Sequence, residues 1–313
     1  ALGERFERAM RTRAIDTTGA GDIFNAGFMY GRVNGYSDRI CLKIGNFAAG
    51  RKVGRSGLAV PDGQEVRKFI SREKLTGLEI VADYDALSKA AAAEVIEQVR
   101  EKHNSTIGLP AGRTPTGMYM ELVKAYRKGG IDFSRARFFG LDEYAGRRKM
   151  EWDSFAHEID ESFFREVNVK KENVFLFNGN ARNLNSECAR FERFIGRAGI
   201  DLIVLGIGNN GHIAFNEPGT SFNSRAHVVK LSTNTINANA RGGSIEDVPK
   251  KAVTIGLESI MGAKRILLIA NGKNKANAIK RAYAGKAGKG CPASVLQGHR
   301  NAEFLVDRAA GKF

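Results

Sequence analysis

The sequence is poor in the residues that crosslink small secreted proteins or hold metal ions. Its 313 residues include 3 cysteines, 6 prolines and 1 tryptophan. The cysteines (Cys41, Cys188 and Cys291) stand far apart, with no CxxC pair and no histidine at a metal-ligand spacing. This spacing argues against a disulfide framework and against a zinc site. We therefore expect no metal, and a reducing cytoplasm as the location.

Long apolar runs are also missing. No stretch approaches the roughly 18–20 apolar residues that a membrane-spanning helix needs. The N-terminal sequence ALGERFERAMRTR is charged throughout, unlike the apolar segment of a signal peptide. We therefore expect no membrane partner. The 42% of hydrophobic residues is ordinary for a globular chain with a buried core.

Acidic residues are outnumbered, which gives a formal net charge of +15. An excess of this size permits nucleic-acid binding. The basic residues, however, are spread along the chain and mixed with acids over most of it, and the clearest acid-free stretch is only residues 273–289. We interpret the excess as solvated helix faces and attraction for small anions, and expect no nucleic-acid partner.

The order of the predicted elements divides the chain into unequal parts. Residues 1–70 end in a helical stretch, residues 71–78 form a polar linker, and a new strand begins near residue 79. From there to residue 313, apolar strands alternate with amphipathic helices. This alternation predicts an α/β fold, a doubly wound and mostly parallel sheet with helices on both faces. Ligands of such sheets bind at the carboxyl ends of the strands.

Two of these strand ends carry glycine or acidic residues. After STIGLP come Gly112, Arg113 and Thr114, where a glycine turn before a helix suits a phosphate group but also serves as an ordinary connection. After ARFFGL come Asp142 and Glu143, acids that disfavour strands. One of them is a candidate general base, although a polar strand end explains both equally simply.

The segment after IDLIVL is the most informative in the chain. It reads GIGNNGHIAFNEPG and contains a literal GxGxxG. A dinucleotide site needs a helix to begin within that motif, whereas Asn216, Pro218 and Gly219 follow here, so we reject it. What remains is His212 with Glu217 nearby, a pair suited to a proton shuttle in which the carboxylate orients the imidazole.

A lysine follows the fourth strand, RILLIA. Lys275 stands in GKNK at the start of a helix, where a cation opposes the helix dipole unless an anion lies near it. A bound phosphate would supply that anion, and a solvent-facing lysine is the simpler alternative. The four signals are weak singly. Because they sit at four strand ends of one predicted sheet, we expect them to converge.

These segments resemble the glucosamine-6-phosphate deaminase family in order and spacing. The resemblance rests on GLPAGRTPTGMY, LDEYAG, NGNA, GIGNNGHIAFNEPGTSF and NGKNKANAI, and it extends from about Glu79 nearly to the C-terminus. It implies the conversion of glucosamine 6-phosphate to fructose 6-phosphate and ammonia, without a metal or an organic cofactor. The related 6-phosphogluconolactonases carry a different continuation after Gly-His.

The resemblance also implies roles for individual residues. Asp142 would be the base that moves a proton between C2 and C1, and His212 would assist ring opening with Glu217 holding it. Asn210 would belong to the ring-opening group, where many relatives have Asp, and Tyr144 would line the sugar site. Five residues would hold the phosphate: Gly112, Arg113, Thr114, Arg241 and Lys275.

Three alternatives remain. A 6-phosphogluconolactonase-like hydrolase is disfavoured by the sequence from Phe215 to Pro218. A non-catalytic sugar-phosphate sensor is disfavoured by the presence of Asp142, His212 and Glu217 together. A sugar kinase is the third. The predicted partner is a small sugar phosphate, and a homo-oligomer is compatible with the sequence.

The N-terminal part carries a second long motif, DTTGAGDIFNAGF. It resembles the signature of ribokinase-like sugar kinases, in which Gly19, Ala20 and Gly21 would present amides to a phosphate and Asp22 would be the base. Asn46 would line the nucleotide site. The signature lies near the C-terminus of such kinases, so we expect residues 1–70 to be a small α/β fragment without kinase activity of its own. ATP and Mg²⁺ would be needed only by a complete kinase part.

Overall fold

The computed structural model describes residues 10, 12–34, 36, 38–57, 60–72, 76–149, 151–239, 246 and 248–313. The chain forms two compact units. One contains Ala1–Gly77 and Gly298–Asn301, and the other contains Leu78–Gln297 and Ala302–Phe313. Within the described residues, no helix is long and apolar enough to cross a membrane.

The first unit is helical in its described residues. It contains α1 (Ala20–Val33), α2 (Asp38–Val53) and α3 (Gly63–Arg72), and between residues 10 and 76 the described part shows no strand. The small α/β fragment expected here is therefore a helical one as far as the structure describes it. Its apolar cluster joins α2 to α3 through Ile40, Ile44, Val66 and Ile70.

Glycines allow α1 and α2 to pack closely. A Cβ added at Gly31 would lie 2.8 Å from Cys41 Sγ, and one at Gly45 would lie 2.8 Å from the Phe24 ring. Both contacts are shorter than real Cβ contacts, so any larger residue would push the helices apart.

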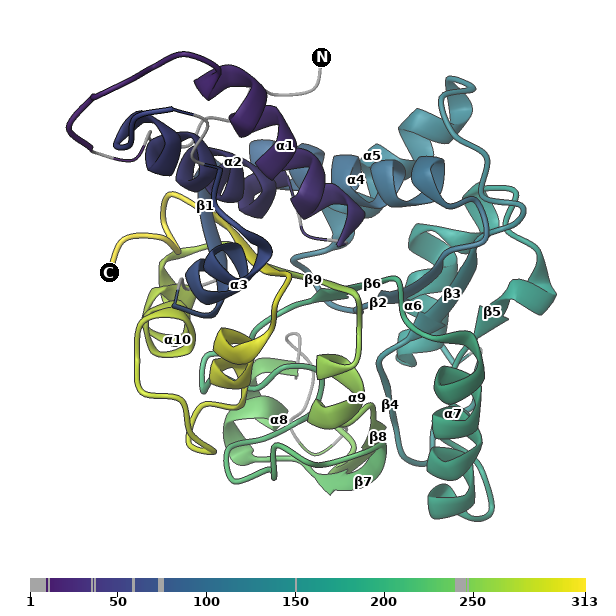
Figure 1. The fold of residues 1–313 in the computed structure, drawn as a ribbon. Coiled ribbons are helices and arrows are strands. Elements are labelled where there is room, and N and C mark those ends of the chain that lie inside the picture. The colour runs from purple at the N-terminus through teal and green to yellow at the C-terminus, as the bar shows by residue number, and fades with distance from the viewer. Residues whose placement is uncertain are drawn as a thin grey trace. The chain divides into compact units, whose positions relative to one another are not determined.

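The second unit is built on a seven-stranded sheet (Figure 1), whose strand order is β1-β10-β9-β6-β2-β3-β5. Each pair from β10 to β5 in that order runs parallel. The predicted mostly parallel sheet is thus confirmed. The strand bounds are β1 (Gly77–Val81), β2 (Thr106–Leu109), β3 (Arg137–Gly140), β5 (Val174–Phe175), β6 (Leu202–Leu205), β9 (Arg265–Ala270) and β10 (Ala302–Asp307).

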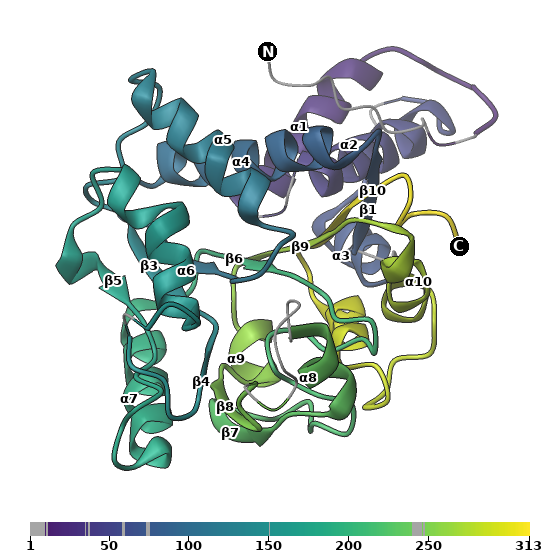
Figure 2. The same cartoon turned by 180° about the vertical axis from the view of Figure 1, so that it is seen from behind.

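Alternating strand residues bury themselves on opposite faces of this sheet. Ile203 and Leu205 of β6 join one apolar cluster, whereas Leu202 and Val204 join another. Figures 1 and 2 show α4 (Tyr84–Glu101) and α5 (Thr116–Arg127) on one side of the strands. The other side carries α7 (Leu184–Ala198), α9 (Leu257–Met261) and α10 (Ala276–Tyr283). Such two-sided burial explains why the strands read as continuous apolar runs.

Side-chain caps start several of these helices. Asp83 accepts a hydrogen bond from the Ala86 amide of α4, Ser154 from the His157 amide of α6 (Phe155–Ser162), and Asn183 from the Ser186 amide of α7. Short 3-10 helices fill connections at η1 (Phe164–Glu166), η2 (Lys171–Asn173), η4 (Lys273–Lys275) and η5 (Pro292–Gly298).

A second, three-stranded sheet was not anticipated. It is antiparallel, in the order β4-β8-β7, and consists of β4 (Asp142–Tyr144), β7 (His227–Lys230) and β8 (Lys251–Thr254). Helix α8 (Thr233–Asn239) follows β7. Because only Leu141 separates β4 from β3, the chain leaves the main sheet and enters the small one at Asp142.

Candidate active site

One cavity lies at the carboxyl ends of four adjacent strands, β9, β6, β2 and β3. Its volume is about 790 Å³. The strand ends contribute Pro110–Pro115, Leu141, Asp142, Gly206–Asn210, His212, Asn271, Asn274 and Lys275, and α8 contributes Asn234, Thr235 and Asn237. The four segments singled out in the sequence thus share one cavity.

The loop after β2 is held in place by hydrogen bonds to two residues outside it, Tyr84 and Asn271. Gly112 takes a φ of 108°, which favours glycine. Behind the loop, the Tyr84 hydroxyl donates to the Arg113 carbonyl at 3.1 Å and accepts from the Gly117 amide at 2.9 Å. In front, the Thr114 hydroxyl donates to Asn271 Oδ1 at 2.8 Å. The loop is therefore shaped before any ligand binds.

Two cationic side chains, Arg113 and Lys275, line the same cavity. Burial lowers the pKa of Lys275 below its usual range. Within the part of the chain that the structure describes, no hydrogen bond or ion pair engages the Lys275 ammonium. A partly buried cation without a counter-charge is costly, and an anionic ligand would offset that cost.

Asp142 faces the cavity from the start of β4. Burial raises the pKa of its carboxyl well above the usual range, and the negative charges of Glu143 and Glu158 raise it further. A carboxylate made more basic in this way is a stronger proton acceptor at a reacting carbon. Position and basicity together suit Asp142 to general-base chemistry.

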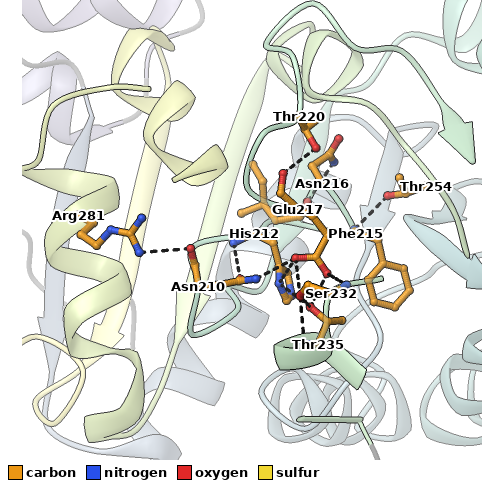
Figure 3. A network of polar contacts seen from close by, with 11 residues as sticks. Asn210, His212, Phe215, Asn216, Glu217, Thr220, Ser232, Thr235, Thr254 and Arg281 are labelled. Atoms are coloured by element: carbon orange, nitrogen blue, oxygen red, sulfur yellow. Dashed lines mark hydrogen bonds and ion pairs between the residues drawn. The ribbon is translucent and has the colours of Figure 1, made fainter. Parts of the chain in front are cut away.

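His212 is oriented by a hydrogen-bonded group that includes Thr235 (Figure 3). The His212 Nδ1 atom lies 3.8 Å from Glu217 Oε2 but 3.3 Å from the Thr235 hydroxyl, which also donates to Glu217 Oε1. Thr235 therefore bridges the imidazole and the carboxylate.

Burial and hydrogen bonding together set the charges of His212 and Glu217. Burial lowers the pKa of His212 to about 4, although Glu217 opposes the shift. Burial raises the pKa of Glu217, but hydrogen bonds from Thr235 and Ser232 outweigh it and keep that pKa below its usual value. Near neutral pH the pair is thus a neutral imidazole beside a carboxylate.

Asn210 fixes the turn that carries His212. Its Oδ1 accepts the His212 amide at 3.1 Å, and its Nδ2 donates to Glu217 Oε2 at 2.8 Å. Gly208 lies against the imidazole, where an added Cβ would come within 2.2 Å of His212 Cε1. Further along, Ala214 has a φ of 47°, an uncommon conformation for a residue other than glycine. The Gly208 backbone therefore lies close against the imidazole, and Asn210 holds the turn that carries it.

Two predicted residues stand away from the cavity surface. Glu217 lies behind His212 and Asn210, consistent with a supporting place. Tyr144, expected to line the sugar site, does not line the described cavity: its ring packs at 4.7 Å from that of Phe155 and 5.6 Å from that of Phe215, the two aromatic residues that do. A third, Arg241, lies outside the described residues.

Several site residues escaped the sequence reasoning. Tyr84, Thr235, Ser232 and Asn271 each hold a predicted residue in place. Asn271 directly follows β9, so the strand-end rule could have found it. Thr235 and Ser232 sit in the polar segment STNT, which carries no pattern that separates them from an ordinary loop.

The kinase-like motif lies in the first unit. Gly19 precedes α1 with a φ of 73°, followed by Ala20, Gly21 and the exposed Asp22 in the first turn. Asn46 lies on α2 next to Gly45, which packs against Phe24 of α1. Upstream, Asp16 accepts hydrogen bonds from buried Lys52 at 2.7 Å and from the Thr18 amide at 2.9 Å, which holds the pKa of Asp16 far below its usual range.

The described residues contain no group of three or more His, Cys, Asp or Glu side chains placed to hold a metal ion.

Sequence comparisons find two families in this chain. Residues 82–305 match the family of glucosamine-6-phosphate isomerases/6-phosphogluconolactonase, and residues 3–63 match the pfkB family of carbohydrate kinases. The chain is 47% identical to a glucosamine-6-phosphate deaminase of Thermoanaerobacter sp. (strain X514) over 233 residues, 74% of this chain and 92% of that one. A deaminase of Oceanobacillus iheyensis is 44% identical over 230 residues, 73% of this chain and 92% of that one.

Solved structures give the same picture. A monomeric glucosamine-6-phosphate deaminase superposes with a TM-score of 0.74 at 40% identity, covering 75% of this chain and 98% of that one. A 6-phosphogluconolactonase of Thermotoga maritima superposes with a TM-score of 0.60 at 22% identity, covering 74% and 100%. The second likeness shows the fold alone. Together these matches confirm both resemblances inferred from the motifs.

Proposed function

The chain belongs to the family of glucosamine-6-phosphate isomerases and 6-phosphogluconolactonases, and we propose that it is a glucosamine-6-phosphate deaminase. The observation that carries this proposal is the cavity itself. A carboxylate with raised basicity, a neutral imidazole and two cations line it from separate strand ends. Among the solved structures, identity of 40% to a deaminase, against 22% to a lactonase, favours deamination over lactone hydrolysis.

The phosphate of the substrate would bind where Arg113, Thr114 and Lys275 meet. Lys275 would supply the buried positive charge, the loop amides would donate hydrogen bonds, and Gly112 would let the backbone approach. The Thr114 hydroxyl would turn its hydrogen from Asn271 Oδ1 to the phosphate. Arg241 is proposed as a further phosphate ligand from the resemblance alone. Phosphate held at one end would position C1 and C2 of the sugar at Asp142 and His212.

The reaction would proceed by proton transfers among chain residues, substrate and water. His212, neutral and oriented by Thr235 and Glu217, would accept the C1 hydroxyl proton and return it to the ring oxygen as the ring opens. Asp142 would take the proton from C2 and deliver it to C1, which moves the carbonyl character to C2. Water then adds at C2 and ammonia leaves, giving fructose 6-phosphate. No step requires a metal or an organic cofactor.

The proposal is tested by incubating the purified chain with glucosamine 6-phosphate, and separately with 6-phosphogluconolactone, without added metal or nucleotide. We expect release of ammonia and fructose 6-phosphate from the first substrate. Hydrolysis of the lactone alone would replace the proposal by the lactonase alternative. Binding of both compounds without turnover would favour the sensor.

The bridging hydroxyl of Thr235 gives a first prediction. Thr235→Val keeps the shape of the side chain but leaves Glu217 short of a donor and the imidazole unanchored. We expect kcat to fall roughly tenfold, equivalent to about 1.4 kcal/mol in the barrier. Thr235→Ser should restore most of it, because the hydroxyl returns. Steady-state kinetics check both, with Thr233→Val at the exposed start of α8 as the control. Equal losses in all three variants would contradict the bridge.

The ammonium of Lys275 gives a second prediction. Lys275→Met removes the charge but keeps an unbranched side chain, so we expect KM to rise on the order of 10- to 100-fold, with a smaller change in kcat. Lys273→Met is the matched control, since Lys273 is exposed two residues earlier and does not line the cavity. Steady-state KM values of the two variants test this prediction. A rise of the same size in the control would mean that general charge, and not this site, attracts the substrate.

The proposed function also concerns the kinase-like N-terminal residues. We propose that residues 1–70 have no kinase activity by themselves, because the described residues there form helices and no strand on which a sugar site could be built. ATP and Mg²⁺ would matter only to a complete kinase part.

The three cysteines are buried and free, which supports a reducing, cytoplasmic location. A homo-oligomer is compatible with the sequence.

A further inference from the structure

The loop after β2 (Gly112, Arg113 and Thr114), called the phosphate loop below, is hydrogen-bonded to an acidic residue, Glu158 of α6. Its Oε1 accepts the Gly112 amide hydrogen at 2.7 Å. Glu158 is not among the residues that line the cavity, whereas Gly112 is. The Gly112 amide therefore points away from the cavity, and a carboxylate fixes it there.

The same helix is held at its start by a second carboxylate. Glu143, the neighbour of Asp142, accepts hydrogen bonds from the Phe155 amide at 3.1 Å and the Ala156 amide at 2.9 Å, the first two residues of α6. Its side chain is 1% exposed. Helix α6 thus runs between two fixed points, the strand that carries Asp142 and the loop that carries Arg113 and Thr114.

The two points need to keep a constant separation if phosphate is to position C2 at the base. Gly112, with a φ of 108°, lies in a backbone region that gives the loop little stiffness of its own. A hydrogen bond from its amide to a side-chain oxygen anchored on α6 supplies that stiffness. The charge of Glu158 also acts on Asp142, whose pKa it raises.

We propose that Glu158 is a positioning residue that fixes the phosphate loop at a set distance from Asp142 while leaving the cavity-facing donors of the loop available to phosphate. The inference rests on the proposed function of the cavity. In the opposite role for the same contact, Glu158 would occupy the Gly112 amide in place of phosphate and be displaced by it. The two roles predict opposite effects on phosphate affinity.

Two substitutions separate the hydrogen bond from the charge. Glu158→Ala removes both, whereas Glu158→Gln keeps an oxygen that accepts the Gly112 hydrogen bond. We expect Glu158→Ala to raise KM roughly tenfold and to weaken binding of fructose 6-phosphate, measured by calorimetry, by a similar factor. Glu158→Gln should keep both within about twofold of the unchanged chain. Glu161→Ala, on the same helix and facing Arg165, is the control and should change neither.

The pH profile supplies a measurement that a merely structural residue would not affect. The charged groups around Asp142 are Glu143 on its own strand, Glu158 on α6, and Arg113 and Lys275 on the cavity wall. Removing the Glu158 charge lowers the pKa of Asp142, so the acidic limb of kcat/KM should move to lower pH in both Glu158 variants and stay in place in Glu161→Ala.

Tighter fructose 6-phosphate binding by Glu158→Ala would overturn the proposal in favour of displacement by phosphate. An unchanged KM with an unmoved acidic limb would reduce Glu158 to a structural residue. These outcomes differ from a failure of the proposed function, in which the unchanged chain itself releases no ammonia. In that case, calorimetry with fructose 6-phosphate still measures how the Glu158 variants change phosphate binding at the loop.

Discussion

Replacing Asp142 by asparagine is expected to lower kcat for ammonia release about 10³-fold, the range typical for loss of a positioned general base. The amide has the shape of the carboxyl group but cannot take the proton from C2. The backbone of Asp142 pairs with Thr254 in the small sheet, and the substitution leaves that pairing in place. Binding should survive, so fructose 6-phosphate is expected to bind Asp142→Asn within a few-fold of its original affinity.

The protonation state of Asp142 also sets the pH dependence of kcat/KM. A base acts only when deprotonated, and burial raises the pKa of this carboxyl above its usual range. The acidic limb of kcat/KM should therefore lie above the pH at which an ordinary aspartate titrates. His212, with a pKa near 4, stays neutral through that range and adds no limb near neutrality.

A matched control sits on α6, where Asp160→Asn removes a surface carboxylate that faces Arg165. It should leave both kcat and the pH profile unchanged. Retention of more than a tenth of the activity by Asp142→Asn would sink the assignment of the base and shift attention to Glu143.

Adding one methyl group at Gly208 should cost about two orders of magnitude in kcat/KM with little loss of stability. The new Cβ would lie 2.2 Å from His212 Cε1 and 2.4 Å from its Nδ1, distances that no real Cβ tolerates. The ring is a side chain and can rotate away, so the fold survives while the imidazole leaves its place beside Thr235. A displacement near 1 Å in an active site can cost about 10²-fold in rate.

Kinetics and thermal unfolding of Gly208→Ala measure these two effects separately. The control is Gly196→Ala in α7, where an added Cβ meets nothing within 4 Å. It should keep full activity. Activity of Gly208→Ala within twofold of the original would show that the imidazole needs no fixed position, and a large fall in Tm would show that the loop, not the ring, gives way.

The sequence predicted the features that depend on local pattern. Continuous apolar runs such as residues 202–205 indicated buried parallel strands, and the strand-end rule directed attention to Arg113, Asp142, His212 and Lys275, which line one cavity. Both successes follow from the periodicity and the geometry of parallel sheets, which any short segment of the chain already expresses.

The sequence did not predict the contacts between distant segments. The small sheet consists of strands of three or four residues, too short for a periodic pattern, and it redirects the chain at Asp142. Thr235 reaches His212 across 23 positions of sequence, and Glu158 reaches Gly112 across 46. The packing of the Tyr144 ring against Phe215 is a contact of the same kind, since the two residues are far apart in the sequence.

The small sheet also bears on how long the molecule remains active. It holds Asp142 at one edge and, through β7, leads directly into α8 with Thr235, while its few strand pairs give it less protection than the seven-stranded sheet. Local opening draws on such sparsely bonded regions first. One opening event there would remove the base and release the imidazole together. Hydrogen exchange of the amides in this small sheet should therefore reveal loss of the active-site geometry before the large sheet unfolds.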